Sequence, residues 1–280
     1  MSQSRSSVRI PTRAQEAESW NRVVVVLDAC VIELFKGKQT LKRRMREKSN
    51  SFGNDSLIDG ELHKGYISKV LGEDPAKYRL DIVHHCLLQL LDSPLCLAGH
   101  LEVYLKLDCG TLVHVDPRFE CPLIFDEFKV ILTELLVFRR VKASEHKHSN
   151  SNQKRSPLSL LRIVKNPLAD HLPTSQQKAI NVFSVGDTAE FVALHDLIAP
   201  TIKEQLSKDG KISVKTRELS MSPVFVIGAF KQNSIDISYW KSMSANYGAI
   251  MREVKISERE LSGGVCCAML THEYESKLRL

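Results

Sequence analysis

Apolar residues recur along the chain at spacings that predict alternating strands and helices. The β-branched run Val23–Leu27 is typical of a buried parallel strand, and Val224–Gly228 repeats this pattern late in the chain. Between them, Ile82–Leu91 and Phe125–Leu136 place apolar side chains on one face of a helix. This alternation predicts an α/β domain with a largely parallel sheet.

Shorter segments complete the predicted order of elements. Leu101–Leu107 and Leu112–Val115 indicate two strands joined by a turn at Asp108-Cys109-Gly110. The remaining expected elements are a strand near Leu160–Val164, a helix over about Thr188–Leu206, a turn at Lys208–Lys211 and a last helix over about Glu260–Tyr274. We find no internal repeat.

Polar stretches indicate where the folded domain begins and where it is interrupted. Residues 1–21 predict a disordered basic arm, which we favour over a transit peptide because Glu16 and Glu18 end the acid-free pattern early. Residues 22–280 are then expected to form one domain, with a flexible basic insertion near 142–156. Residues 39–49 are also strongly basic, and we interpret them as a solvated helix face rather than an RNA contact.

Composition narrows the class of protein only slightly. The chain carries 39 Lys and Arg against 33 Asp and Glu, a net charge of +6 that fits a nucleic-acid partner without requiring one. Seven cysteines without a CxxC pair predict buried, reduced thiols in a reducing compartment. We expect no metal site, and no membrane association, because no apolar run approaches the roughly 18 residues of a membrane span.

Three segments carry a family resemblance. The run Arg79-Leu80-Asp81-Ile82-Val83-His84-His85, continuing to Leu90-Leu91-Asp92-Ser93-Pro94-Leu95, is similar to R-P-D-I-T-H-Q…L-L-D-S-P-L. Val164–Pro173 is similar to I-K-N-P-x-x-D-H-x-P, and Val226–Phe230 resembles a strand that ends in glycine. In this order they resemble the nucleolar essential, pseudouridine-N1-specific rRNA methyltransferases of the SPOUT superfamily.

The resemblance implies a SPOUT-type knotted methyltransferase fold of the α/β class, with a C-terminal trefoil knot. It also implies S-adenosyl-L-methionine as cofactor and small-subunit rRNA as substrate. The implied assembly is a homodimer with pre-ribosomal proteins as partners, and the implied location is the nucleolus, within the nucleus. The implied activity is methylation of ring nitrogen 1 of a pseudouridine, coupled to small-subunit biogenesis. The alternatives are a catalytically weak or inactive RNA-binding assembly factor of the same fold, and a methyltransferase with another RNA substrate.

The cofactor residues are expected at two places. Gly228 ends an apolar strand, where a main chain without a side chain can approach a ligand closely, and the resemblance adds Ala229. The family's x-[IL]-S-N-Y-P-L-S loop corresponds to residues 255–262, in which the matching positions are Ile256, Ser257, Leu261 and Ser262. Glu258, Arg259 and Glu260 replace Asn-Tyr-Pro, which changes the charge around the cofactor's sulfonium and carboxylate.

Arg79 and Asp81 are expected to bind RNA. An arginine can clamp a phosphate with two hydrogen bonds, and an acid two residues away can orient that arginine. A surface ion pair worth ~0–1 kcal/mol is the alternative. Asp81 is also the candidate catalytic residue, acting by orienting Arg79.

A further segment differs from the corresponding family motif. Val115–Phe128 lines up with V-N-P-x-x-R-I-P-R-T-F-x-R-F, and the three arginines that bind RNA in the family are Glu120, Leu123 and Glu127 here. Each lost phosphate contact should weaken RNA binding and flatten its salt dependence by roughly 0.7 on a log–log scale. Arg118 is expected to bind RNA, and Arg118, Arg139 and Arg140 could compensate only in part for the lost arginines.

Overall fold

The computed structural model describes residues 20–35, 56–143, 158–172, 179–184, 186, 188–209, 212–230 and 235–280, with side chains described outside 205–216. Residues 1–19, the basic stretch 39–49 and nearly all of the predicted insertion at 142–156 lie outside the described residues. The expected arm, insertion and domain boundaries therefore stay predictions.

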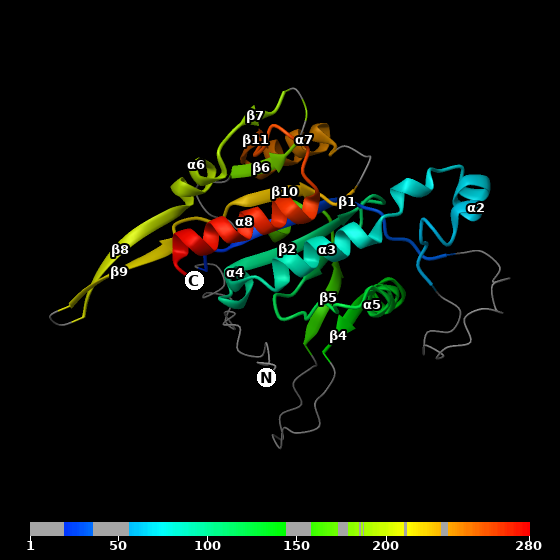
Figure 1. Ribbon diagram of the computed structural model, residues 1–280, viewed down its shortest axis with the longest axis horizontal. Helices are drawn as coiled ribbons and strands as arrows, with labels where there is room; N and C mark the ends of the chain where they lie inside the picture. Colours follow the sequence, from blue (N-terminus) through cyan, green and yellow to red (C-terminus); the bar gives the residue numbers. More distant parts are fainter. Residues whose placement is uncertain are drawn as a thin grey trace, which may run out of the picture.

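A mixed sheet forms the centre of the molecule (Figure 1). Within the described residues it has nine strands in the order β4-β5-β3-β2-β1-β10-β6-β11-β7. Their bounds are β1 Val23–Cys30, β2 Leu101–Leu107, β3 Leu112–Val115, β4 Arg140–Lys142, β5 Ser159–Val164, β6 Ala179–Phe183, β7 Glu190–Phe191, β10 Val224–Gly228 and β11 Ile250–Lys255. From β2 to β7 neighbouring strands are parallel, and β3, β5 and β4 pair antiparallel at the other edge. The prediction of a largely parallel sheet is confirmed.

Two apolar strands occupy the middle of the sheet because helices or loops cover both of its faces. β1 and β10 pair in parallel with Val24 beside Val224 and Asp28 beside Gly228. Val23–Leu27 is fully buried, and so is Phe225 in the neighbouring strand. Continuous apolar runs are typical of parallel strands that have no solvent-facing side.

The helices form a layer on each face of the sheet (Figure 1). One face packs against α3 (Leu80–Leu91), α4 (Pro94–Leu97), α5 (Phe125–Phe138), α6 (Leu194–Ile198) and α8 (Gly263–Leu278). The other face packs against α7 (Ile237–Tyr247), whose Trp240 is fully buried. The short α2 (Lys64–Tyr66) lies with residues 56–78 in a separate small cluster of apolar side chains. The predicted helices near 82–91, 125–136 and 260–274 are confirmed as α3, α5 and α8.

The predicted helix over 188–206 is wrong. This segment contains β7, the single-turn helix α6, a 3₁₀ turn at Ala199–Thr201 and the start of β8 (Ile202–Asp209). Pro200 lacks a backbone N–H and cannot continue an α-helix through its interior. Beyond it, pairing of β8 with β9 (Ile212–Leu219) gives the backbone its partners, so long-range strand pairing overrides the helical pattern.

The strands β8 and β9 form a separate two-stranded ribbon that projects from the body of the molecule (Figure 1). The ribbon reverses between Asp209 and Ile212, where the sequence predicts a turn. The turn at Asp108-Cys109-Gly110 is likewise confirmed, and Gly110 adopts the positive φ of 81° that favours glycine there. All seven cysteines are free thiols, and only Cys109 in this turn is exposed.

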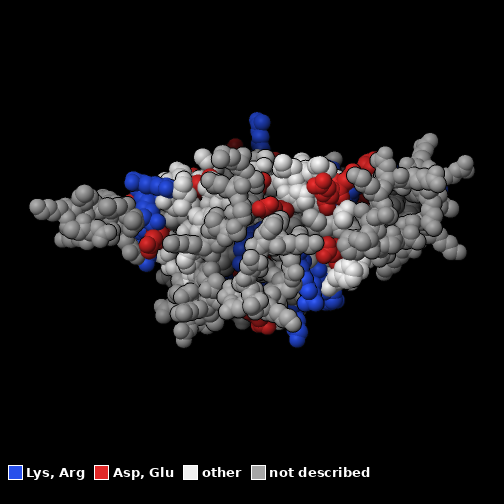
Figure 2. All heavy atoms as spheres, turned by 90° about the horizontal axis from the view of Figure 1, so that it is seen from below, with Lys and Arg blue, Asp and Glu red and all other residues white. Residues whose placement is uncertain are grey.

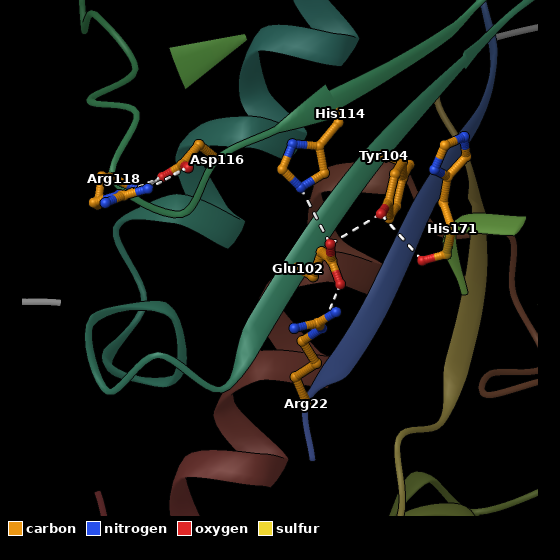
Figure 3. Close-up of polar contacts among 7 residues, drawn as sticks. All are labelled: Arg22, Glu102, Tyr104, His114, Asp116, Arg118 and His171. Atoms are coloured by element: carbon orange, nitrogen blue, oxygen red, sulfur yellow. Dashed lines mark hydrogen bonds and ion pairs between the residues drawn. The ribbon is translucent and has the colours of Figure 1, made fainter. Parts of the chain in front are cut away.

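A buried polar cluster lies on the α7 side of the sheet (Figure 3). The carboxylate of Glu102 on β2 accepts hydrogen bonds from the hydroxyl of Tyr104 at 2.9 Å and from Nε2 of His114 at 3.1 Å. Arg22, just before β1, forms an ion pair with the same carboxylate. Glu102 is 8% exposed, so these partners replace the water that an ionised carboxylate requires.

Candidate functional site

A cavity of about 380 Å³ lies at the carboxyl ends of β6, β10 and β11. In open α/β sheets, ligands bind beyond the carboxyl ends of the strands, and this volume lies within the range of about 300–1,000 Å³ for small-molecule pockets. Its apolar walls include Phe183, Ile227 and Phe230, and its charged lining residues are Glu253, Lys255, Arg259 and Glu260. The cavity can therefore hold a ligand with an apolar part and a charged part.

Four of the six predicted cofactor residues line this cavity, namely Gly228, Ile256, Ser257 and Leu261. The other two do not. Ala229 is 3% exposed and donates its N–H to the carbonyl of Asp28 at 3.0 Å. Ser262 is the N-cap of α8, and its hydroxyl accepts a hydrogen bond from the N–H of Val265 at 3.4 Å. Both residues hold the backbone that surrounds the cavity.

Two glycines allow β10 and the first turn of α8 to meet at the cavity. A Cβ atom on Gly263 would lie 2.5 Å from the carbonyl oxygen of Gly228 and 3.1 Å from Sγ of Cys86. A Cβ atom on Gly228 would overlap the ring of Phe230. The sequence predicts that a ligand can approach the backbone closely at Gly228. In the structure, the ring of Phe230 and the backbone of α8 also lie close to this position.

Asp28 is a buried acid that sequence analysis missed. It lies beside Gly228 in the sheet and is 1% exposed. Its carboxylate accepts hydrogen bonds from Nζ of Lys106 at 2.8 Å and from Nε1 of Trp240 at 2.6 Å. These contacts tie β1, β2 and α7 together next to the cavity. The available signal was an acid directly after the apolar run Val23–Leu27.

The altered loop after β11 contributes charge to the cavity. Arg259 and Glu260 line it, while Glu258 is exposed and is not among the lining residues. The backbone N–H of Arg259 donates to the hydroxyl of Ser257 at 3.1 Å, which holds the loop in a turn. Among the described residues, the side chains of Lys255, Arg259 and Glu260 form no ion pair. Their charges are thus available to a ligand.

Arg79 and Asp81 form a bidentate ion pair at the start of α3. Nε of Arg79 donates to Oδ1 of Asp81 at 2.8 Å, and Nη2 donates to Oδ2 at 2.6 Å. The hydrogen bonds from Arg79 hold the pKa of Asp81 below its usual value. Both side chains line a second cavity of about 880 Å³ that also contains Asp59, Tyr78 and Lys129. Asp81 therefore does not line the cavity at Gly228. Its lowered pKa also makes its carboxylate a weak base.

Arg118 is paired in the same way with Asp116 (Figure 3). Its Nε and Nη2 atoms lie 2.8 and 2.7 Å from the two carboxylate oxygens, and its side chain is 30% exposed. The side chains at the three departing positions, Glu120, Leu123 and Glu127, are all exposed. Within the described residues that Figure 2 shows, acidic and basic side chains lie in separate small groups rather than in one continuous basic surface.

No group of His, Cys, Asp or Glu in the described part of the chain is arranged to hold a metal ion. Nor does any helix among the described residues have the length and apolar character needed to cross a membrane.

Comparison with known proteins establishes the family. The EMG1/NEP1 methyltransferase family model matches residues 25–275. The chain belongs to this family. A ribosomal RNA small subunit methyltransferase NEP1 of Homo sapiens is 30% identical over 257 residues, covering 91% of this chain and 81% of the relative. The corresponding nep-1 protein of Caenorhabditis elegans is 32% identical over 223 residues, covering 80% and 79%.

A solved structure supports the fold of this EMG1/NEP1 methyltransferase. Nep1 of Archaeoglobus fulgidus, determined with S-adenosylhomocysteine bound, matches with a TM-score of 0.62 at 19% identity and covers 93% of this chain and 100% of its own. The expected SPOUT-type α/β fold is thereby confirmed. Threading of α8 into a trefoil knot stays a prediction.

Proposed function

We propose that this protein transfers a methyl group from S-adenosyl-L-methionine to ring nitrogen 1 of a pseudouridine in small-subunit rRNA, as part of small-subunit biogenesis. The observation that carries the proposal is the cavity at the carboxyl ends of β6, β10 and β11, lined by Gly228 and by Ile256, Ser257 and Leu261, the loop positions that match the family motif. The relatives named as small-subunit rRNA methyltransferases support the substrate class.

The residues present fit this cofactor. Apolar side chains such as Ile227, Phe230 and Leu261 suit an adenine ring, and backbone at Gly228 and Ile256 lies within the same lining. Arg259 carries the charge that complements an amino-acid carboxylate. Bound there, the cofactor supplies a methyl group on a positively charged sulfur.

Positioning is the main task of the protein in such a transfer. The accepting nitrogen, the methyl carbon and the sulfur must be collinear, and holding that geometry supplies much of the rate. The nitrogen–carbon bond would form as the carbon–sulfur bond breaks, the neutral thioether S-adenosylhomocysteine would leave, and the proton of ring nitrogen 1 would pass to water. A depressed pKa makes Asp81 unsuited to removing a proton, so its role in this proposal is to orient Arg79. Arg79 then presents its remaining N–H groups to an RNA phosphate.

We further propose a homodimer that works with pre-ribosomal proteins in the nucleolus. Apolar side chains are exposed on adjoining helices of one surface, with Leu97 of α4 at 46%, Val265 of α8 at 44% and Met269 of α8 at 38%. Burial of such side chains against a second copy would favour association.

A second candidate function is an RNA-binding assembly factor with weak or no catalysis. It is favoured by the exposed Glu120, Leu123 and Glu127 at the positions of the family's arginines. Two acids there would repel phosphate, and Arg79 and Arg118 are already paired within the chain.

Transfer of a tritiated methyl group to an rRNA hairpin distinguishes the two functions. We expect incorporation into a hairpin that contains pseudouridine and none into the same hairpin with uridine. Lack of incorporation at saturating cofactor, with RNA binding retained, would establish the assembly factor instead. If calorimetry shows no binding of S-adenosylhomocysteine, both the assigned cofactor and the proposed methyl transfer are wrong.

A further inference from the structure

Glu253 is an acid on β11 whose side chain faces the cavity. Its Oε2 atom accepts a hydrogen bond from the hydroxyl of Thr188 at 3.0 Å. Its Oε1 atom lies 3.2 Å from the position that a Cβ on Gly186 would occupy, so a larger residue there would crowd the carboxylate. Both contacts come from the segment that follows β6. The hydrogen bond from Thr188 holds one carboxylate oxygen in place.

The charge of Glu253 is not neutralised by its neighbour in sequence. Arg252 points to the opposite side of the strand, where its Nη2 atom pairs with Glu190 of β7 at 3.1 Å. Among the described residues, Glu253 forms no ion pair of its own. A ligand in the cavity therefore meets a half-buried carboxylate that can accept further hydrogen bonds.

We infer that Glu253 binds the ribose hydroxyls of the cofactor, with Thr188 as its positioning residue. This inference rests on the proposed function. A carboxylate near the carboxyl end of a parallel strand can accept hydrogen bonds from both hydroxyls of a ribose, as acids do in nucleotide-binding α/β sheets. The other donors on the cofactor are its ammonium group and the amino group of adenine. The adenine ring suits the apolar lining at Ile227, Phe230 and Leu261 rather than the carboxylate. Lys255 at the end of β11, and Arg259 and Glu260 on the loop beyond it, already offer both signs of charge to the amino-acid end.

The affinities of two ligands for the purified full chain distinguish contact of Glu253 with the ribose from contact with the ammonium group. S-adenosylhomocysteine carries both groups, while 5′-methylthioadenosine carries the ribose and lacks the amino-acid part. Glu253→Gln should weaken both ligands by the same factor, roughly tenfold to a hundredfold, because hydrogen bonds to a charged group are lost. Thr188→Val should weaken both by less, and Thr188→Ser should restore the wild-type affinity because it keeps the hydroxyl.

Glu218→Gln is the matched control, because Glu218 is exposed on β9, outside the cofactor loop, and does not line the cavity. It should leave both dissociation constants unchanged, and thermal melting should show that every variant is folded. If Glu253→Gln weakens only S-adenosylhomocysteine, Glu253 binds the ammonium group and the ribose assignment is wrong. A third ligand, 2′-deoxy-5′-methylthioadenosine, keeps the adenine amino group and lacks one ribose hydroxyl, so the variant should weaken it less than 5′-methylthioadenosine. Equal weakening of these two ligands would assign Glu253 to the adenine amino group instead. If it weakens neither ligand, Glu253 does not contact the cofactor. Failure of the wild type to bind S-adenosylhomocysteine would overturn the proposed function as well.

Discussion

At the scale of single residues, the buried charges of this protein are held by partners that are distant in sequence. Glu102 illustrates the balance, since burial alone would raise the pKa of its carboxyl group. The hydrogen bond to His114, the charge of Arg22 and the hydrogen bond from Tyr104 outweigh burial and lower that pKa below its ordinary value. The ionised form of Glu102 is thus favoured in the folded state, and its stabilisation depends on pH.

Glu102→Gln should lower the free energy of unfolding by about 3 kcal/mol at pH 7, because it leaves Arg22 and His114 without their carboxylate. The folded-state pKa lies below the unfolded value near 4.5, so this stabilisation is complete above that pH and is lost as the pH falls through the folded-state pKa. Urea unfolding at pH 7 and at lower pH should show the gap between wild type and variant narrowing below about pH 4.5. The exposed Glu61→Gln is the control, and a gap that stays constant at low pH would contradict the argument.

The pair of Arg79 and Asp81 should behave as one unit in RNA binding. Asp81→Gly leaves Arg79 unoriented, so it should weaken binding about as much as Arg79→Ala does. The double variant should lose less than the sum of the two, because residues in contact couple. Gel-shift affinities for the rRNA hairpin measure this, and strict additivity of the two free-energy changes would show that the residues act separately.

At the scale of helices and strands, the sequence predicts those elements whose apolar pattern follows directly from which of their faces are buried. β1 and β10 are apolar because both sheet faces are covered, and α3 shows one apolar face because only one side packs. β11 was not predicted, because Arg252 and Glu253 interrupt its apolar pattern where the strand reaches the cavity and the surface. α7 was also missed, since its buried Trp240 depends on Asp28, which is 212 residues away.

The same division applies to the site. The loop residues Ile256, Ser257 and Leu261 could be predicted from a family motif, and they line the cavity. Glu253 could not, because its contact with Thr188 depends on strand register and on a distant loop. For Asp28 the sequence shows an acid after an apolar run, but its partners Lys106 and Trp240 lie far along the chain. Local sequence patterns contain no information about such contacts.

Two adjacent glycines at the start of α8 should respond in opposite ways to alanine. Gly263→Ala places a methyl group 2.5 Å from the carbonyl oxygen of Gly228, so α8 must shift and the free energy of unfolding should fall by about 2 kcal/mol. Gly264→Ala meets Cβ of His85 at 3.7 Å and the backbone carbonyl carbon of His85 at 4.0 Å, both ordinary contacts. It should raise stability by roughly 0.5 kcal/mol because alanine favours the helix.

Urea unfolding and S-adenosylhomocysteine calorimetry on both variants check this contrast. Gly263→Ala should also weaken the ligand, since Gly263 lines the cavity and Gly264 does not. Equal stability of the two variants would mean that α8 is not closely packed against β10.

At the scale of the whole molecule, net charge does not describe the surface offered to RNA. The chain carries a net charge of +6, yet Arg79 and Arg118 are engaged by acids and the start of α5 presents Asp126 and Glu127. Counterion release depends on cations that reach phosphates, so paired arginines contribute less than their number implies. The exposed positions 120, 123 and 127 are therefore where a change of charge should alter RNA binding most.

Restoring arginine at the three departing positions tests that surface. The variant Glu120→Arg/Leu123→Arg/Glu127→Arg should bind the rRNA hairpin more tightly than wild type. The slope of log affinity against log salt should steepen by about 0.7 for each phosphate newly contacted, or roughly 2 for all three. Titrations between low and moderate salt measure both quantities.

The matched control carries the same change of charge elsewhere, as Asp196→Arg/Glu275→Arg/Leu280→Arg on α6 and at the end of the chain. Added charge acts at long range in low salt, so the control should gain a little affinity there. It should keep the wild-type slope, because its three positions lie outside Val115–Phe128, the segment aligned with the family's RNA-binding arginines. An equal gain in slope for both variants would mean that RNA responds to total charge alone. An unchanged slope for the first variant would show that the start of α5 does not face RNA, and the loss of the family's arginines would then carry no weight against methyl transfer.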